Sequence, residues 1–280
     1  MPGALRQPHG PTVFGQLAST LGRWQNLLGL TQNRCVHCLR PFSAHFTTYP
    51  AAEALLCPDC QQRFAAYAGP RCPRCGLPPS NPDEGNVVCG ACLQNPPPWS
   101  GAAFHGLYRA ALRHALLRLK FDGHLYLAPL LGGFLLDAAS CLQRPDVLTA
   151  VPQHPDHLRR RGYNQAHELA KALHNLSGVP LDAQLLTRPV PGQKQEKLGA
   201  TARRSNVLHS FAAAPAVYGQ CVWLVDDVMN TGSTLAAAAR ALLAGGATRV
   251  DVIFAARTPL NAAPLPGDAV PMPSGLATTT

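Results

Sequence analysis

Four Cys-x-x-Cys pairs between residues 35 and 92 constrain the fold of this chain more than any other feature. The two-residue spacing lets a pair of thiolates converge on one tetrahedral ion at about 2.3 Å, with the backbone turning between them. Two pairs complete a four-thiolate site, so eight cysteines predict two structural zinc (Zn²⁺) sites. The predicted ligands are Cys35, Cys38, Cys57, Cys60, Cys72, Cys75, Cys89 and Cys92.

The order in which the four pairs combine is open from the sequence alone. Eighteen residues separate the first pair from the second, and 13 separate the third from the fourth, spacings typical of zinc ribbons and knuckles. Pairing along the chain is the simplest arrangement, and an interleaved one is the alternative. Disulfides, redox-active Cys-x-x-Cys motifs and an iron–sulfur cluster fit less well. A cytosolic chain keeps its thiols reduced, a redox motif normally occurs once, and iron–sulfur ligands are spaced differently.

Two further features could suggest reactive or metal-binding sites. Cys141 and Cys221 stand alone in the sequence and are expected to be buried core thiols. His154 and His157 form a His-x-x-His motif, but the four cysteine pairs already account for zinc, and a proline follows His154. Neither feature adds a site to the prediction.

Length and charge limit the partners. The 280 residues suffice for one sizeable core and a small appended module. No apolar run approaches the about 20 residues that span a bilayer, and residues 1–24 do not resemble a signal peptide, so a cytoplasmic location is expected. The basic residues are 20 arginines and 4 lysines, and the net charge is +9. Guanidinium groups bind phosphate bidentately, which favours phosphorylated small molecules or nucleic acid as partners, although a biased genomic composition would produce the same excess.

The hydrophobic pattern after residue 104 alternates between strands and helices. Short apolar runs predict strands at 146–152, 220–227 and 249–257. Helical periodicity is found at 107–121, 127–143, 164–175 and 232–246, with a polar loop before the third of these. Strands that alternate with helices in this way form a parallel sheet covered by helices, so the predicted fold class is α/β.

These patterns divide the chain into four parts. Residues 1–34 are an N-terminal extension with a candidate amphipathic helix, and residues 35–98 are a double zinc-ribbon module that ends in a stiff run of three prolines. Residues 99–258 form the α/β domain. Residues 259–280 are rich in proline, alanine and threonine without periodicity, so a disordered tail is expected.

Two adjacent aspartates, Asp226 and Asp227, end the predicted strand at 220–227 and precede a loop of small and hydroxyl-bearing residues. At the carboxyl end of a parallel strand, the backbone N–H groups of such a loop and the N-terminus of the next helix attract a phosphate. The carboxylates can accept hydrogen bonds from vicinal sugar hydroxyls, so a 5-phosphoribosyl group fits both. A simple capping turn would not need two aspartates. The predicted phosphate-binding residues are Asn230, Thr231, Gly232, Ser233 and Thr234.

The segment Val225–Thr234 resembles the signature of type I phosphoribosyltransferases, V-D-D-V-x-T-T-G-x-T, and matches seven of its eight fixed positions. Asn230 replaces the usual threonine. Asparagine still tolerates turn dihedrals and donates through its amide, so altered phosphate affinity is expected rather than loss of the site. The resemblance implies binding of phosphoribosyl pyrophosphate with Mg²⁺, with Asp226 and Asp227 as the catalytic pair on the ribose hydroxyls.

Further stretches extend the resemblance to the ComF/GntX family, zinc-finger phosphoribosyltransferase-like proteins of bacteria. They are VPQHPDHLRRRGYNQAHELAKAL (151–173), TRPVPGQKQEKLGATARRSNVLHSF (187–211) and CLQNPPPW at the end of the cysteine-rich module. With the eight cysteines, the match covers about residues 35–258. It implies a type I phosphoribosyltransferase-like domain at 99–258 joined to a zinc-ribbon module, and a role in competence or in the use of imported DNA.

By the same resemblance, basic and amide side chains contact pyrophosphate or form a hood over the site. Gln193 and Lys194 depart from the family's pattern in the hood. The alternative for the arginines is a solvated basic face, and for Lys120 a side chain that extends to solvent from a helix end. The implied residues are Lys120, Arg159, Arg161, Asn164, Gln165, Arg188 and Arg203, with Gln195 and Asn206 beside them.

Three functions are consistent with the sequence. The chain could be an active phosphoribosyltransferase, for which no segment identifies the acceptor, or a non-catalytic module that binds phosphoribosyl pyrophosphate. It could also handle single-stranded DNA through its zinc module and arginines, together with DNA-uptake proteins. Aromatic residues make up only 6% of the chain, so an extended base-stacking platform is not evident.

Overall fold

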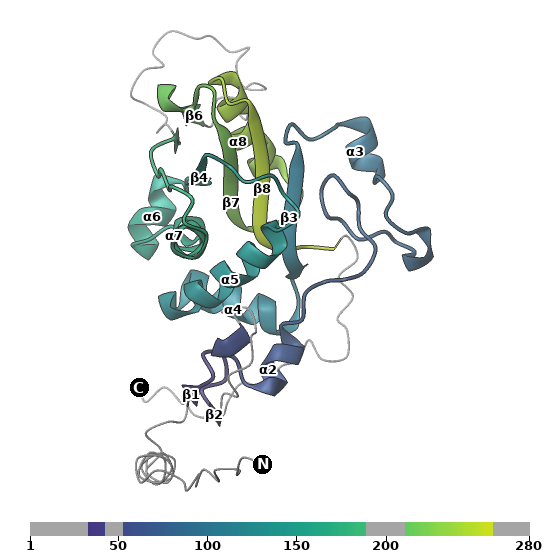
Figure 1. The fold of residues 1–280 in the computed structure, drawn as a ribbon, viewed down its shortest axis with the longest axis vertical. Helices are drawn as coiled ribbons and strands as arrows, with labels where there is room; N and C mark the ends of the chain where they lie inside the picture. The colour runs from purple at the N-terminus through teal and green to yellow at the C-terminus, as the bar shows by residue number, and fades with distance from the viewer. Residues whose placement is uncertain (1–32, 43–52, 189–210, 260–280) are drawn as a thin grey trace, which may run out of the picture.

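The computed structural model describes residues 33–42, 53–188 and 211–259 (Figure 1). Within these ranges, no helix is long and apolar enough to cross a membrane. The helix expected near the N-terminus and all but the first residue of the expected tail at 259–280 lie outside the described residues.

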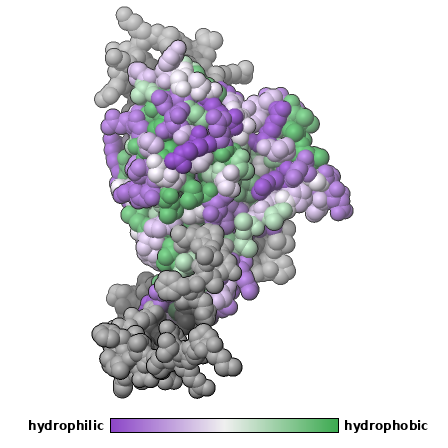
Figure 2. All heavy atoms as spheres, viewed as in Figure 1, coloured by the Kyte–Doolittle hydropathy of each residue, from purple (hydrophilic) through white to green (hydrophobic). Residues whose placement is uncertain are grey.

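Figure 2 shows the face of the molecule that is seen in Figure 1. Hydrophilic residues cover much of this face, interrupted by hydrophobic patches.

A parallel sheet forms the centre of the molecule, as the sequence predicts, and it has four strands. Its strands lie in the order β3 (Gly101–Leu107), β8 (Arg249–Arg257), β7 (Cys221–Met229) and β4 (Val147–Ala150). Strand β3 was not expected, and the helix expected at 107–121 begins only at Ala110. Small residues fill much of β3, so neither alternation nor an apolar run marks it; pairing with β8 along six residues defines it.

Helices cover both faces of this sheet (Figure 1). On one face lie α4 (Ala110–Phe121), α5 (Ala128–Ala139) and α7 (Gln165–Ser177), which pack on alternate strand residues such as Trp223 and Val225. On the other face, α8 (Ser233–Ala244) packs on Val222 and Leu224. Successive side chains of a strand point to opposite faces, so the nearly continuous apolar run of β7 serves both cores.

A short helix, α6 (Pro155–Arg161), occupies the segment that the sequence predicted as a polar loop. Pro155 suits the first helical position, and His154 Nδ1 accepts a hydrogen bond from the backbone N–H of Asp156 at 3.3 Å. Gly162 ends the helix in the left-handed conformation, with φ of 82°. A helix this short, set between a proline and a glycine, leaves no periodic pattern in the sequence.

The cysteine-rich segments pack against this α/β body on opposite faces. Cys35, Cys57 and Cys60 join the core formed with α4 and α5, whereas Cys72 and Cys92 join the core on the α8 side. The remaining short elements are β1 (Asn33–Arg34), β2 (Pro41–Phe42), η1 (Glu53–Leu55), α2 (Pro58–Arg63), η2 (Pro82–Glu84), α3 (Gly90–Gln94), η3 (Leu125–Leu127), β5 (Leu186–Thr187), β6 (Ala212–Ala213) and η5 (Pro215–Val217).

Candidate metal centres and phosphoribosyl site

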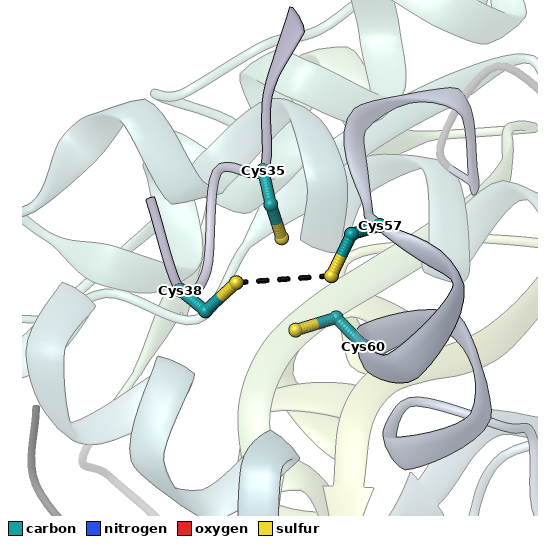
Figure 3. Close-up of side chains that lie close together, drawn as sticks. All are labelled: Cys35, Cys38, Cys57 and Cys60. Atoms are coloured by element: carbon teal, nitrogen blue, oxygen red, sulfur yellow. Dashed lines mark hydrogen bonds between the residues drawn. The ribbon is translucent and has the colours of Figure 1, made fainter. Parts of the chain in front are cut away.

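The first four-cysteine group consists of Cys35, Cys38, Cys57 and Cys60, whose sulfur atoms point toward a common centre (Figure 3). Cys57 lies at the N-cap of α2 and Cys60 within that helix, while the other pair lies on the turn between β1 and β2. The sulfurs of Cys38 and Cys57 are 3.7 Å apart, far beyond the about 2.05 Å of a disulfide. All four sulfurs lie within 4.8 Å of one another, which suits four ligands around one ion.

The second four-cysteine group consists of Cys72, Cys75, Cys89 and Cys92 and has the same construction. Cys89 is the N-cap of α3, and the sulfurs of Cys75 and Cys89 are 3.7 Å apart. The backbone N–H of Cys89 also donates to Cys72 Sγ at 3.4 Å. The two groups therefore combine the four pairs in order along the chain, which was the simplest arrangement expected.

Each of these groups contains one thiol with a lowered pKa. Burial opposes ionisation of Cys35 and Cys72, but hydrogen bonds from backbone N–H groups lower the pKa of each thiol to about 7. Burial instead raises the pKa of Cys60 and Cys92. A bound cation is what would favour four thiolates here, and an all-thiolate tetrahedral set is typical of structural zinc.

The two cysteines outside these groups differ from each other. Cys221 is buried at the start of β7, as expected for a core thiol. Cys141 is exposed, so the expectation of a buried thiol was wrong there. It follows the end of α5, where the Sγ–H donates to the backbone carbonyl of Ala138 at 3.4 Å.

A crevice opens at the carboxyl ends of β4 and β7, which pair side by side. The chain leaves β4 toward α7 on one face of the sheet and leaves β7 toward α8 on the other. Adjacent strands whose connections diverge in this way create a ligand-binding crevice in α/β folds. A cavity of ≈ 190 Å³ lies there, and seven of the predicted site residues line it: Lys120, Arg161, Asn164, Gln165, Arg188, Asp226 and Thr234.

The two aspartates lie in the last part of β7, which continues past them to Met229. Asp227 is buried, and its Oδ2 accepts a hydrogen bond from Gln165 Nε2 at 3.1 Å and lies 3.8 Å from Lys120 Nζ. Asp226 is half-buried, and burial together with the charge of Asp227 raises its pKa well above its usual range. The structure thus gives Asp227 side-chain partners from α4 and α7. Asp226 Oδ1 accepts a hydrogen bond from the adjacent backbone N–H of Asp227 at 2.9 Å, and Asp226 faces the cavity with a destabilised negative charge.

Residues 230–234, which are the loop after β7 and the first two residues of α8, are called the phosphate loop below. Gly232 adopts φ of 80°, a left-handed conformation that glycine allows without strain, and is the N-cap of α8. Thr231 Oγ1 accepts from the backbone N–H of Ser233 at 3.3 Å and lies 3.0 Å from Ser233 Oγ. The hydroxyl-bearing residues of the loop, Thr231, Ser233 and Thr234, are exposed. Asn230 Oδ1 instead accepts a hydrogen bond from Thr258 Oγ1.

The segment after β4 supplies the basic and amide groups of the cavity. Asn164 caps α7, because its Oδ1 accepts from the backbone N–H of Ala166 at 3.0 Å, while its Nδ2 donates to Val151 O at 3.0 Å. Arg161 Nη1 donates to Gln165 Oε1 at 3.4 Å. The Asn164 amide therefore fixes the backbone at the start of α7, and the Gln165 amide connects Arg161 to the buried Asp227.

Not every predicted residue joins the cavity. Arg159 does not line it, and its guanidinium pairs with Asp156 at 3.2 Å on the exposed side of α6. Five other predicted site residues are also absent from the cavity lining: Asp227, Asn230, Thr231, Gly232 and Ser233. Arg188 does line it and lies 5.4 Å from the ring of Phe211. The expected hood residues Arg203, Gln195 and Asn206 lie outside the described residues.

The sequence reasoning missed part of the cavity wall. Gln153, His154 and His157 line it, and Gln153 Nε2 donates to Gln165 Oε1. The two imidazole rings are 6.3 Å apart, and within the described residues only the two four-cysteine groups gather metal-binding side chains closely. The available signal was the position of these residues directly after the predicted strand at 146–152.

Comparison with known protein families agrees with this geometry. Residues 158–264 match the phosphoribosyl transferase domain family, a stretch that contains α7, the Asp-Asp strand and the phosphate loop. The parallel sheet, the crevice and this match define a phosphoribosyltransferase-like domain, to which the two four-cysteine groups are attached.

Related proteins that carry a name show to which family the chain belongs. The DNA utilization protein YhgH of Salmonella typhimurium is 36% identical over 193 residues, which cover 67% of this chain and 84% of that protein. Competence protein F of Haemophilus influenzae is 30% identical over 233 residues, 80% of this chain and 96% of that protein. The chain belongs to the ComF family of competence and DNA utilization proteins.

One solved structure illustrates the extent of structural similarity. The glutamine phosphoribosylpyrophosphate amidotransferase of Bacillus subtilis matches 46% of this chain and 26% of its own, with 23% sequence identity and a TM-score of 0.35.

Proposed function

We propose that this protein binds phosphoribosyl pyrophosphate, together with Mg²⁺, in the crevice between β4 and β7. The observation that carries the proposal is that Asp226 and the N-terminal end of α8 face the same cavity as Arg161 and Lys120. A phosphoribosyl ligand needs carboxylates for its diol, N–H groups for its phosphate and cations for its pyrophosphate. The cavity of ≈ 190 Å³ is lined by one carboxylate, Asp226, by Thr234 in the first turn of α8, and by three cations, Lys120, Arg161 and Arg188.

In this proposal the residues have separate tasks. Asp226 accepts hydrogen bonds from the ribose hydroxyls, and Asp227 holds Gln165 and Lys120 in place around them. The phosphate loop donates backbone and hydroxyl groups to the 5-phosphate. Arg161 and Arg188 face the pyrophosphate, whose Mg²⁺ would take oxygen ligands from the carboxylates and the ligand.

Transfer of the phosphoribosyl group is the chemistry that this arrangement would support. As pyrophosphate leaves, positive charge develops at the anomeric carbon, and a nearby carboxylate stabilises it while arginines neutralise the leaving group. The names of the relatives lead us to propose that the site serves competence or the use of imported DNA in the cytoplasm. The acceptor would be a compound of that process.

A second candidate function is contact with single-stranded DNA beside the cavity. Phe121 is 62% exposed, and its ring lies 5.1 Å from the guanidinium of Arg161 and 5.8 Å from Lys120 Nζ. Tyr126, also exposed, accepts a hydrogen bond from Arg118 at 2.7 Å. Exposed aromatic rings next to cations suit base stacking and phosphate contact. Affinity for oligonucleotides that falls steeply with salt and decreases in Phe121→Ala would support this function.

A ligand series tests the main proposal. Thermal melting of the zinc-loaded protein would be measured with phosphoribosyl pyrophosphate and Mg²⁺, with ribose 5-phosphate, and with pyrophosphate and Mg²⁺. At 100 times the dissociation constant, a ligand stabilises the folded state by about 2.7 kcal/mol, which raises Tm by roughly 5–10 °C. We expect the largest rise with phosphoribosyl pyrophosphate and a smaller one with ribose 5-phosphate. No rise with either phosphoribosyl ligand would contradict the proposal.

A further inference from the structure

Arg257, the last residue of β8, is a buried cation with an unusual set of partners. Its side chain is only 4% exposed, and within the described residues no carboxylate lies within ion-pair distance. The guanidinium donates to backbone carbonyls instead: to those of Cys75 at 3.0 Å, Met229 at 2.9 Å and Thr258 at 2.9 Å, and to that of Asn230. A buried guanidinium satisfied only by carbonyls depends on the exact position of each of them.

These carbonyls belong to two different parts of the molecule. Cys75 is a member of the second four-cysteine group, whereas Met229 ends β7 and Asn230 begins the phosphate loop. Nε donates to the first part and Nη1 to the second, so one planar group joins them. Because the guanidinium is rigid, a shift of the Cys75 backbone would disturb the hydrogen bonds at the start of the loop.

Trp99 makes a second connection between the same two parts. Its Nε1 donates to the carbonyl of Arg74, which lies between two cysteines of the second group, at 2.8 Å. The far edge of the same indole packs against the phosphate loop, since a Cβ placed on Gly232 would lie 3.3 Å from Trp99 Cη2. Because the indole is buried, its contact with Gly232 supports the phosphate loop from the interior of the protein.

The first four-cysteine group has a different neighbour. It lies on the opposite face of the sheet, where Arg118 of α4 donates to the carbonyl of His37 at 3.0 Å. In the part of the chain that the structure describes, no hydrogen bond joins this group to the phosphate loop. The two groups, alike in ligands and spacing, thus differ in what they contact.

We propose that the second four-cysteine group, when it holds its metal, positions the phosphate loop, and that Arg257 and Trp99 are the positioning residues that connect them. The proposal builds on the proposed phosphoribosyl site. A metal fixes the backbone of Cys72–Cys75, and that backbone supplies the carbonyls of Arg74 and Cys75. Phosphoribosyl affinity then depends on the second site and not on the first.

Matched cysteine variants test this dependence. Cys89→Ser removes a ligand of the second site, and Cys38→Ser removes one of the first; both cysteines are partly exposed. Metal content would be measured by atomic emission, and amide hydrogen exchange would be followed on the peptide covering 226–234. We expect Cys89→Ser to speed exchange in this peptide and to weaken phosphoribosyl pyrophosphate binding at least 10-fold, while Cys38→Ser changes neither by more than about 2-fold.

Arg257→Lys and Trp99→Phe test the connection itself, even if a cysteine variant does not fold. A lysine keeps the charge but has a single nitrogen in place of the separate Nε and Nη1 donors of the rigid guanidinium, and phenylalanine keeps the packing but loses the Nε1 hydrogen bond. We expect both variants to retain two metal ions per chain, to exchange faster at 226–234 and to bind the ligand more weakly. In the double variant Arg257→Lys/Cys89→Ser, the increase in exchange at 226–234 and the loss of affinity should be smaller than the sum of the two single effects.

Two results would overturn the proposal. One is unchanged exchange at 226–234 in Cys89→Ser or in Arg257→Lys. The other is an equal effect of Cys38→Ser and Cys89→Ser. If the wild-type protein binds no phosphoribosyl ligand, the proposed function fails, but the exchange measurement still decides whether the second site positions the loop.

Discussion

Asp226 lies in the proposed ligand site, and its buried negative charge lowers the stability of the folded protein. Burial, and then the charge of Asp227, raises the pKa of Asp226, so the folded protein binds this proton more tightly than the unfolded chain does. Stability therefore falls as the pH rises from about 4, the pKa of an unfolded aspartate, through the raised pKa of the folded state. A residue that lowers stability is expected where function, rather than packing, determines the side chain.

We predict that Asp226→Asn stabilises the protein at pH 8. The amide cannot ionise, so Tm should rise by about 2–4 °C, the change that about 1 kcal/mol produces in a protein of this size. The gain should shrink as the pH is lowered toward 4 and disappear below it, where the wild-type carboxyl is protonated in both the folded and the unfolded state. Thermal melts of wild type and variant across this pH range measure the difference.

Asp227→Asn is the matched control for this prediction. Asp227 accepts from Gln165 and lies near Lys120, so its replacement removes favourable contacts and should not raise Tm. If Asp226→Asn lowers Tm at pH 8, or if both variants raise it equally, the assignment of the destabilising charge to Asp226 is wrong.

At the residue scale, the groups that could be predicted from the sequence are those that are contiguous in the chain. The Asp-Asp pair and the phosphate loop are contiguous in the chain, and so are the cysteines of each pair. Arg257 was not anticipated, because its partner Cys75 is 182 residues away and its role depends on the assembled fold. Gln153 was missed for the same reason, since its contact with Gln165 crosses the connection between β4 and α7.

At the scale of elements, α5 and α7 cross in close contact. A Cβ on Gly132 would lie 2.5 Å from Ala172 Cβ and 3.1 Å from the backbone of the same residue. Gly132 therefore sets the separation of the two helices that cover one face of the sheet, and α7 in turn carries Gln165 to the aspartates.

We predict that Gly132→Ala lowers the free energy of unfolding by about 1–3 kcal/mol, because the helices must move apart. The loss should appear as a lower midpoint of urea unfolding with an unchanged slope. Ala172→Gly in the same chain should recover part of the loss by removing the methyl group that clashes. No destabilisation by Gly132→Ala, or no recovery in the double variant, would contradict the close packing of these helices.

The elements that the sequence predicted best have strong local signals. Helix α8 begins after a glycine in the left-handed conformation and ends at Gly245, and β8 is an apolar run bounded by polar residues, so both were placed almost correctly. Strand β3 and helix α6 carry no such pattern. Their existence depends on pairing with β8 and on capping by His154, which are properties of the folded chain.

At the scale of the whole molecule, the two four-cysteine groups are part of the two cores. Each contributes buried cysteines to the hydrophobic cluster on one face of the sheet. Loss of metal would leave four mutually close thiols in each cluster, one of which, Cys35 or Cys72, has a pKa of about 7. The loss of stability should therefore spread beyond the cysteine-rich segments.

We predict that the protein contains two zinc ions per chain and that their removal lowers Tm by more than about 10 °C. The reason is that metal binding contributes directly to folding free energy in sites of this kind. Atomic emission before and after chelation, followed by thermal melting, measures both quantities, and two equivalents of zinc should restore the original Tm. Metal-free protein that melts at the original temperature would contradict the prediction.

The central claim is that the crevice between β4 and β7 binds a phosphoribosyl ligand. Calorimetric titration of the zinc-loaded protein with phosphoribosyl pyrophosphate and Mg²⁺ tests this claim most directly, with Asp226→Asn/Asp227→Asn as the comparison. We predict micromolar binding to the wild type and none to the double variant, whose fold and metal content are checked in parallel. Absence of binding to the wild type, or equal binding to both proteins, would contradict the account.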